Sequence, residues 1–120
     1  MSEATGPAGG GLSEAEGRAL LEARFQAAGF SVEVDHRFEQ DGLELTLDGF
    51  DPRARVGYEL ITTAAGDRAE FTAEVVARLE EGMAAGRYHL LLVDEAAVGR
   101  RTLERAADRF LQRVRAGRAE

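Results

Sequence analysis

The stretch LELTLDGFDPRARVGYELITT, residues 43–63, decides the fold. Apolar and polar residues alternate over residues 43–48 and again over residues 55–63, which is the period of a strand with one buried face. Asp51-Pro52 lies between the two runs, and this dipeptide is typical of a turn. The stretch therefore predicts two strands that are neighbours in one sheet.

Hydrophobic periodicity on both sides of this stretch predicts the other elements. Val32, Val34, His36 and Phe38 alternate with polar residues, which predicts a strand over residues 31–39 with these four on one face. Residues 40–42 then form a tight turn into the central stretch. Apolar residues at helical spacing predict three helices, and the run YHLLLV at residues 88–93 predicts a buried strand, either central or parallel. The helices are expected over residues 13–28, 67–85 and 100–116.

The residues at the helix ends support these bounds. Ser13 and Glu16 have the spacing of a capping box, and Asp67 is the expected cap of the second helix. Each helix is followed by a glycine that suits a left-handed stop: Gly29, Gly86 and Gly117. The predicted order is α-β-β-β-α-β-α, and the predicted fold class is α+β (α/β), with one four-stranded mixed sheet flanked by helices.

Length and composition favour a single domain. Residues 1–11 are rich in glycine and are expected to be a disordered lead-in, and residues 12–120 are expected to form one α/β domain. Cysteine is absent, which excludes disulfides, zinc–thiolate sites and thiol catalysis. Since no apolar run is long enough to span a bilayer and no signal peptide is visible, we expect a cytoplasmic location.

The charge argues against a nucleic-acid partner. The formal net charge is −7, and all 15 basic residues are arginine, so no lysine amine is available for proton transfer. Local basic patches at Arg53 and Arg55, or over residues 100–118, stay open as alternatives. Within residues 100–118, Glu104 and Asp108 lie between arginines at helical spacing, which favours a solvated helix face.

Two acids of the central stretch form a candidate metal site. Asp48 ends the first strand and Glu59 lies inside the second, so a short hairpin places them side by side. Mg²⁺ and Mn²⁺ bind such carboxylates, and Asp51 in the turn is a further oxygen donor. The alternative is that these acids solvate the sheet and the turn. His36 and His89 lie in predicted strands, where a lone histidine is usually a hydrogen-bonded core or edge residue.

The element order and the local text LDGF (47–50) followed by GYE (57–59) resemble the PD-(D/E)XK nuclease-like superfamily. The resemblance covers residues 13–94 and implies a restriction-endonuclease-like core of order α-β-β-β-α-β. It also implies that Asp48 and Glu59 ligate Mg²⁺ or Mn²⁺. An acid of the first helix, Glu22 or Glu14, would complete the metal site.

In active members of that superfamily a lysine lies two positions after the glutamate. That position here is Ile61, which carries no charge and cannot hydrogen-bond water. An arginine such as Arg55, Arg68 or Arg78 is the only available substitute, and arginine is a poor proton-transfer group.

Three functions follow as hypotheses. The first is a non-catalytic, nuclease-like module that acts through a protein partner or self-association, with Leu103, Phe110 and Val114 of the last helix as a contact face unless the chain's own core uses them. The alternative is a divergent Mg²⁺- or Mn²⁺-dependent nuclease that cleaves DNA or RNA with Asp48 and Glu59 as metal ligands. The third is an acidic inhibitor whose surface mimics a polyanion.

Overall fold

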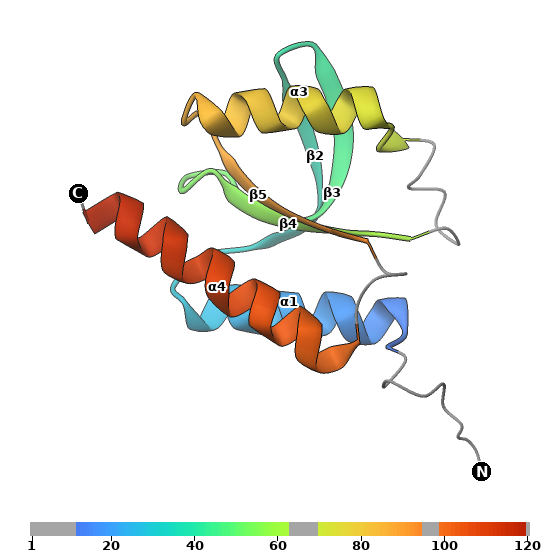
Figure 1. The fold of residues 1–120 in the computed structure, drawn as a ribbon, viewed down its shortest axis with the longest axis vertical. Coiled ribbons are helices and arrows are strands. Elements are labelled where there is room, and N and C mark those ends of the chain that lie inside the picture. Colours follow the sequence, from blue (N-terminus) through green and yellow to red (C-terminus); the bar gives the residue numbers. More distant parts are fainter. Residues whose placement is uncertain (1–11, 63–69, 95–98, 120) are drawn as a thin grey trace.

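The computed structural model describes residues 12–62, 70–94 and 99–119. Within these residues the fold is α+β, with three helices and one four-stranded mixed sheet (Figure 1). The elements are α1 (Glu14–Ala27), β2 (Glu33–Gln40), β3 (Leu43–Asp51), β4 (Val56–Ile61), α3 (Ala73–Ala84), β5 (His89–Asp94) and α4 (Arg100–Ala119). The predicted order α-β-β-β-α-β-α is confirmed over the described residues. No described helix is long and apolar enough to cross a membrane.

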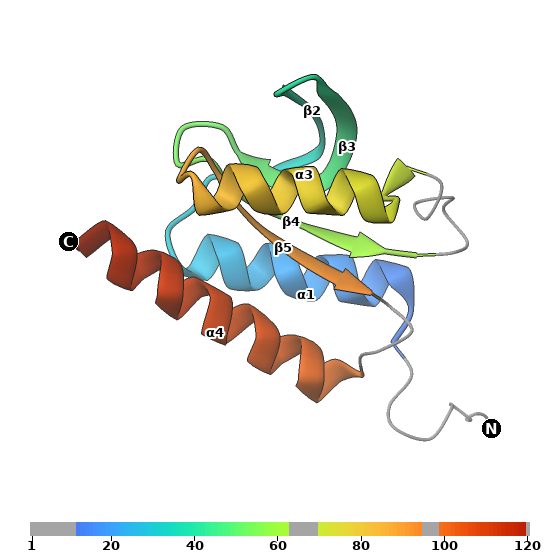
Figure 2. The ribbon, with the colours of Figure 1, turned by 45° about the horizontal axis from the view of Figure 1, so that its top comes forward.

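The sheet has the strand order β2-β3-β4-β5. The first three strands form an antiparallel meander, and β5 is parallel to β4. The prediction of a parallel strand after a crossover helix is therefore confirmed, whereas the central position is wrong, because β5 lies at an edge of the sheet. Figures 1 and 2 show α3 on one face of the sheet and α1 with α4 on the other.

Two apolar clusters fill the space between the sheet and the helices. The cluster under α1 and α4, called here the α1–α4 core, contains Leu21, Phe25, Val56, Tyr58, Leu60, Val93, Leu103, Ala107, Phe110, Leu111 and Val114. The cluster under α3, called the α3 core, contains Phe38, Leu43, Leu45, Leu47, Phe50, Phe71, Leu79, Tyr88 and Leu90. The alternation in β4 follows from this division, because every second residue faces the α1–α4 core.

Strand β2 departs from the prediction that four of its residues share one face. Asp35 has φ +51°, in the left-handed region, and the alternation changes face there. Val32 packs against the α1–α4 core, whereas Phe38 belongs to the α3 core, and Val34 is 51% exposed. The register of β2 with β3 is the same before and after Asp35, so the change of face does not come from an inserted residue. The hairpin of β2 and β3 curls over α3, as Figure 2 shows.

Several predicted helix ends are confirmed. Ser13 Oγ accepts the Glu16 N–H at 3.1 Å, and the Glu16 carboxylate accepts the Ser13 N–H at 3.0 Å, which completes the capping box of α1. Gly29 and Gly86 have φ of +101° and +78°, as left-handed stops require. Helix α3, in contrast, begins later than predicted, because its cap is Thr72, whose hydroxyl accepts the Val75 N–H.

Other predicted bounds are wrong. Strand β3 continues through Gly49 and Phe50 to Asp51, so the first central strand does not end near Asp48. Helix α4 continues past Gly117 to Ala119, because a glycine inside a helix costs only about 1 kcal/mol and nothing next to it requires a turn. The expected cap Asp67, Arg68 and the lead-in 1–11 lie outside the described residues.

Candidate functional site

Asp48 and Glu59 meet where β3 and β4 separate. The main-chain pairing of the two strands ends at Gly49 and Tyr58. Beyond this pair the Asp48 N–H donates to Glu59 Oε1 at 2.7 Å, and the Leu60 N–H donates to Asp48 Oδ2 at 2.8 Å. Each carboxylate thus accepts a main-chain hydrogen bond at the point where the ladder stops. The predicted proximity of the two acids is observed.

The two carboxylates differ in access to solvent. Glu59 is 1% exposed, whereas the side chain of Asp48 is 11% exposed and lines a small pocket of about 290 Å³. Glu22 of α1, the third predicted site residue, lines the same pocket and accepts a hydrogen bond from Gln26 Nε2 at 3.3 Å. Glu22 and Asp48 therefore line the same pocket. Glu14 is at the exposed start of α1 and is not among the residues lining this pocket.

Arg18 of α1 is the basic residue beside Asp48. Its Nε lies 3.4 Å from Asp48 Oδ1, and its Nη2 lies 2.6 Å from Asp35 Oδ1. Burial acts to lower the pKa of Arg18, but the negative charges of Asp48 and Asp35 outweigh it, and the pKa is raised. A permanent cation therefore balances the charge of Asp48. Sequence reasoning missed Arg18, although it lies one helical turn before Glu22.

Tyr58 of β4 lines the same pocket. Burial raises the pKa of its hydroxyl, and the charges of Glu22 and Asp48 raise it further. The hydroxyl therefore stays protonated at physiological pH. Its ring packs so closely over Gly49 that a Cβ there would lie 2.3 Å from the ring carbon Cζ. Such an approach requires glycine.

Three of the four carboxylate oxygens of Asp48 and Glu59 already contact other groups of the protein. A metal needs carboxylate oxygens with lone pairs directed at one point. Asp48 directs one oxygen at the Leu60 N–H and the other towards Arg18, and Glu59 directs Oε1 at the Asp48 N–H. Over residues 12–62, 70–94 and 99–119 there is no group of three acids or histidines that could hold a metal. Metal binding by Asp48, Glu59 and Glu22 remains a prediction for experiment.

Position 61, where the resemblance to the nuclease-like superfamily implies a lysine, has apolar surroundings. Ile61 packs against the α3 core. The predicted substitutes lie elsewhere: Arg55 donates to the Arg87 carbonyl and to the Gln40 side chain, and Arg78 donates to the Asp41 carbonyl. Each of these arginines therefore bonds a residue at the turn between β2 and β3, Gln40 or Asp41.

Asp51 serves the turn between β3 and β4. Its carboxylate accepts the N–H groups of Arg53, Ala54 and Ser31 at 2.9, 3.0 and 2.8 Å, and the residue is 6% exposed. Burial alone would raise the pKa of Asp51, but these three donors outweigh it and the pKa is lowered. Of the two interpretations of Asp51, the turn is the one that its contacts support.

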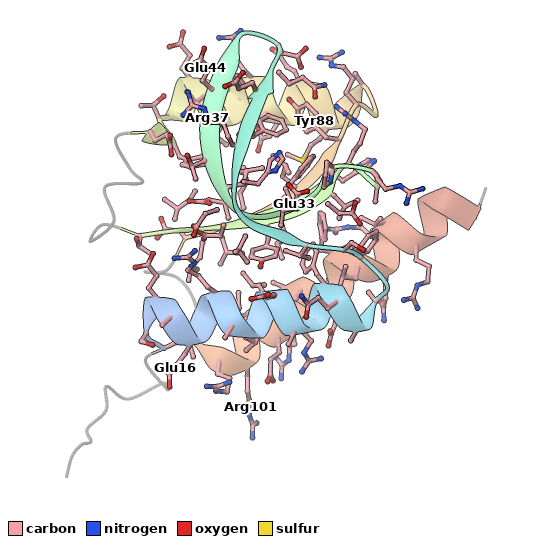
Figure 3. All side chains as sticks on the ribbon, turned by 180° about the vertical axis from the view of Figure 1, so that it is seen from behind. Glu16, Glu33, Arg37, Glu44, Tyr88 and Arg101 are labelled. Atoms are coloured by element: carbon pink, nitrogen blue, oxygen red, sulfur yellow. The ribbon has the colours of Figure 1, made fainter. Side chains whose placement is uncertain are left out.

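The remaining candidates are structural or solvated. His36 Nδ1 lies 2.9 Å from Glu33 Oε1, and its ring packs on Phe50. Over residues 100–117 of α4 the arginines lie at the surface, as Arg101 in Figure 3 illustrates. Arg24 of α1 pairs with Asp108 and lies 3.6 Å from Glu104. These contacts are those of a solvated helix face.

The expected contact face on α4 is used by the chain itself. Leu103, Phe110 and Val114 are at most 7% exposed and belong to the α1–α4 core. The expected apolar face is therefore mostly used by the chain's own core, although Phe110 and Val114 also line a groove that is described below.

Comparisons with known proteins found no relative of this chain. No family model, no curated protein and no solved structure matches this chain.

Proposed function

We propose that this chain is a non-catalytic member of the PD-(D/E)XK nuclease-like superfamily that acts by binding a protein partner. The α-β-β-β-α-β order over α1 to β5 supports the restriction-endonuclease-like core. The position of Asp48 and Glu59 on adjacent middle strands supports the same relationship. Under this proposal, Asp48 and Glu59 occupy the positions of the superfamily's metal ligands but no longer bind a metal ion.

The observation that carries the proposal is the contact of Arg18 with Asp48. A guanidinium cannot take a proton from water at physiological pH, and it supplies no open coordination position for a substrate phosphate. Glu59 is buried and bonded to the main chain, and Ile61 replaces the lysine. The three residues together support a structural role for the former site.

The charge supports a protein partner over a nucleic acid. A net charge of −7 repels the phosphate backbone, and binding to DNA or RNA depends largely on neutralising phosphates. The competing function is a Mg²⁺- or Mn²⁺-dependent nuclease, which would need the same two acids to be available to a metal.

Asp48→Asn distinguishes the two functions. If Asp48 is a structural partner of Arg18 and of the Leu60 N–H, the substitution should lower the free energy of unfolding by about 1–2 kcal/mol. If the acids form a working metal site, removing one should relieve repulsion and stabilise the protein. Urea denaturation shows whether the substitution lowers or raises the free energy of unfolding. Calorimetry with Mn²⁺ on the unmodified protein should detect no binding at millimolar concentration.

Asp35→Asn is the matched control, because Asp35 contacts the same arginine but is 65% exposed. It should change the stability by less than Asp48→Asn does. Mn²⁺ binding by the unmodified protein, together with metal-dependent cleavage of DNA or RNA that Asp48→Asn abolishes, would overturn the proposed function in favour of the nuclease.

A further inference from the structure

The outer edge of β5 has no strand partner among the described residues. The His89 N–H donates inwards to the Arg55 carbonyl, so main-chain groups of alternate residues, Leu90 and Leu92, point to the open edge. The Leu90 N–H donates to Met83 Sδ at 3.2 Å. A thioether is a weak acceptor on a flexible side chain, so this protection of the edge is easily displaced.

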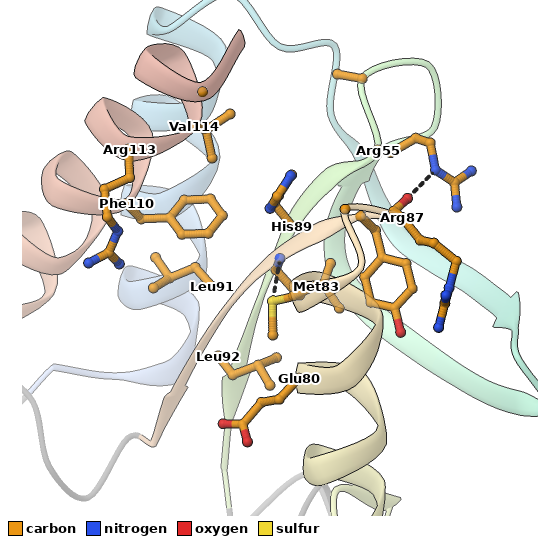
Figure 4. A pocket seen from close by; sticks show the side chains of 15 residues that line it. Arg55, Glu80, Met83, Arg87, His89, Leu91, Leu92, Phe110, Arg113 and Val114 are labelled. Atoms are coloured by element: carbon orange, nitrogen blue, oxygen red, sulfur yellow. Dashed lines mark hydrogen bonds between the residues drawn. The ribbon is translucent and has the colours of Figure 1, made fainter. Parts of the chain in front are cut away.

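A groove of about 680 Å³ follows this edge, and Figure 4 shows its two walls. Leu92, Met83 and Glu80 lie on the α3 side. Leu91 and Phe110 lie on the α4 side. Because side chains of a strand project alternately to its two faces, a strand added to β5 would direct every second side chain to each wall. The groove is thus shaped for an extended peptide.

The groove is locally basic in an acidic protein. Arg113 on the α4 wall has no acidic partner within the described residues, and Arg55 bonds only a carbonyl and an amide oxygen there. Arg87 also lines the groove but is paired with Asp41. Glu80 is the acid among the lining residues. The excess of arginine over acid favours a carboxylate on the occupant.

We propose that this edge binds an extended segment of a partner protein in which apolar and acidic residues alternate. Its main chain pairs with Leu90 and Leu92 after the Met83 side chain moves aside. Its apolar side chains contact Leu92, and its carboxylates face Arg113. This inference rests on the proposed function and names the chemistry of the partner. A second copy of β5 fits less well, because its sequence HLLLVD has no alternating acids.

The test is a titration of the ¹⁵N-labelled full chain, followed by amide chemical shifts. The probe is an acetylated and amidated hexapeptide of alternating valine and glutamate. We expect saturable shifts at Leu90 and Leu92, with affinity falling about tenfold for Arg113→Glu. Arg109→Glu, an equally exposed arginine of α4 outside the groove, should change the affinity by less than about twofold.

Two further peptides separate strand pairing from charge. A valine–lysine peptide should bind at least about tenfold more weakly, and a valine–glutamate peptide with alternate amides N-methylated should not bind, because it cannot pair with both Leu90 and Leu92. Equal binding of the methylated peptide would overturn the inference, as would shifts confined to residues outside β5 and the groove. Concentration-dependent shifts of β5 without peptide would overturn it in favour of self-association.

The two proposals fail in different experiments. Mn²⁺ binding with metal-dependent cleavage removes the proposed function whatever the peptide does. Absence of peptide binding, with no metal binding and no cleavage, removes the inference about β5 alone.

Discussion

Replacing Asp51 tests whether this acid belongs to the turn or to a metal site. Its carboxylate accepts three main-chain N–H groups at 2.8–3.0 Å and joins the segment before β2 to the turn before β4. Asp51→Ala removes all three acceptor contacts. At about 1 kcal/mol for each donor, the loss in unfolding free energy should be about 3 kcal/mol. Asp51→Asn keeps Oδ1, which serves Arg53 and Ala54, and should lose about 1–2 kcal/mol.

The pH dependence gives a second, independent readout for Asp51. Its pKa is lower in the folded protein than in the unfolded chain, where it is about 3.9. The ionised carboxylate therefore adds stability that is fully present above that unfolded value and is lost as the pH falls through the folded pKa. The stability difference between the unmodified protein and Asp51→Asn should shrink as the pH falls from about 5 through the folded pKa.

Urea denaturation followed by circular dichroism measures both effects. Asp108→Ala is the control, because Asp108 pairs with Arg24 at the surface and its side chain is 49% exposed, so its loss should cost at most about 1 kcal/mol. The assignment of Asp51 to the turn is refuted if Asp51→Ala is no more destabilising than Asp108→Ala. It is also refuted if the loss of unfolding free energy in Asp51→Asn is unchanged at low pH.

Two further predictions concern local geometry. Gly49→Ala should destabilise the fold by about 2–4 kcal/mol, because the added methyl lies 2.3 Å from the buried Tyr58 ring, whereas Gly117→Ala, with open space around its Cβ, should stabilise α4 by about 0.5–1 kcal/mol. Equal effects in thermal denaturation would contradict this account. Ser13→Ala removes the hydroxyl that accepts the Glu16 N–H and should cost about 1 kcal/mol, and Ser13→Asp, which keeps an acceptor, should recover most of it in the same assay.

The fold could be predicted from the sequence where one local rule acts alone. The capping box of α1, the left-handed Gly29 and the apolar side of α4 each depend on residues a few positions apart, and all three are observed. The meander followed because both connections between its strands are short. Such features need no knowledge of distant contacts.

The wrong predictions arose where distant parts of the chain decide the outcome. The change of face at Asp35 coincides with a contact to Arg18, which lies 17 positions earlier. The end of β3 is set by the carboxylate of Asp51, whose donors lie on both sides of it in the sequence. The edge position of β5 depends on the strand order, which an apolar run does not reveal.

The contacts of the candidate site could likewise be predicted from the sequence only in part. The spacing of Asp48 and Glu59 on neighbouring strands predicted that they meet, and they do. It could not predict the cation, because Arg18 comes from a helix 30 residues before Asp48. Composition excluded lysine chemistry, yet it could not show which arginine would lie beside the acids.

Under the proposed relationship to metal-dependent nucleases, the isoleucine at position 61 is one of three departures, and they reinforce one another. Ile61 adds its side chain to the α3 core, so a cation at that position would have to leave apolar contacts. Glu59 is 1% exposed and bonds the Asp48 N–H, so releasing it for a metal would disrupt the junction of β3 and β4. Arg18 already balances Asp48, so a metal would have to displace a partly buried guanidinium. A single substitution at position 61 therefore leaves two barriers in place, which is why a structural role for the acids is the simpler account.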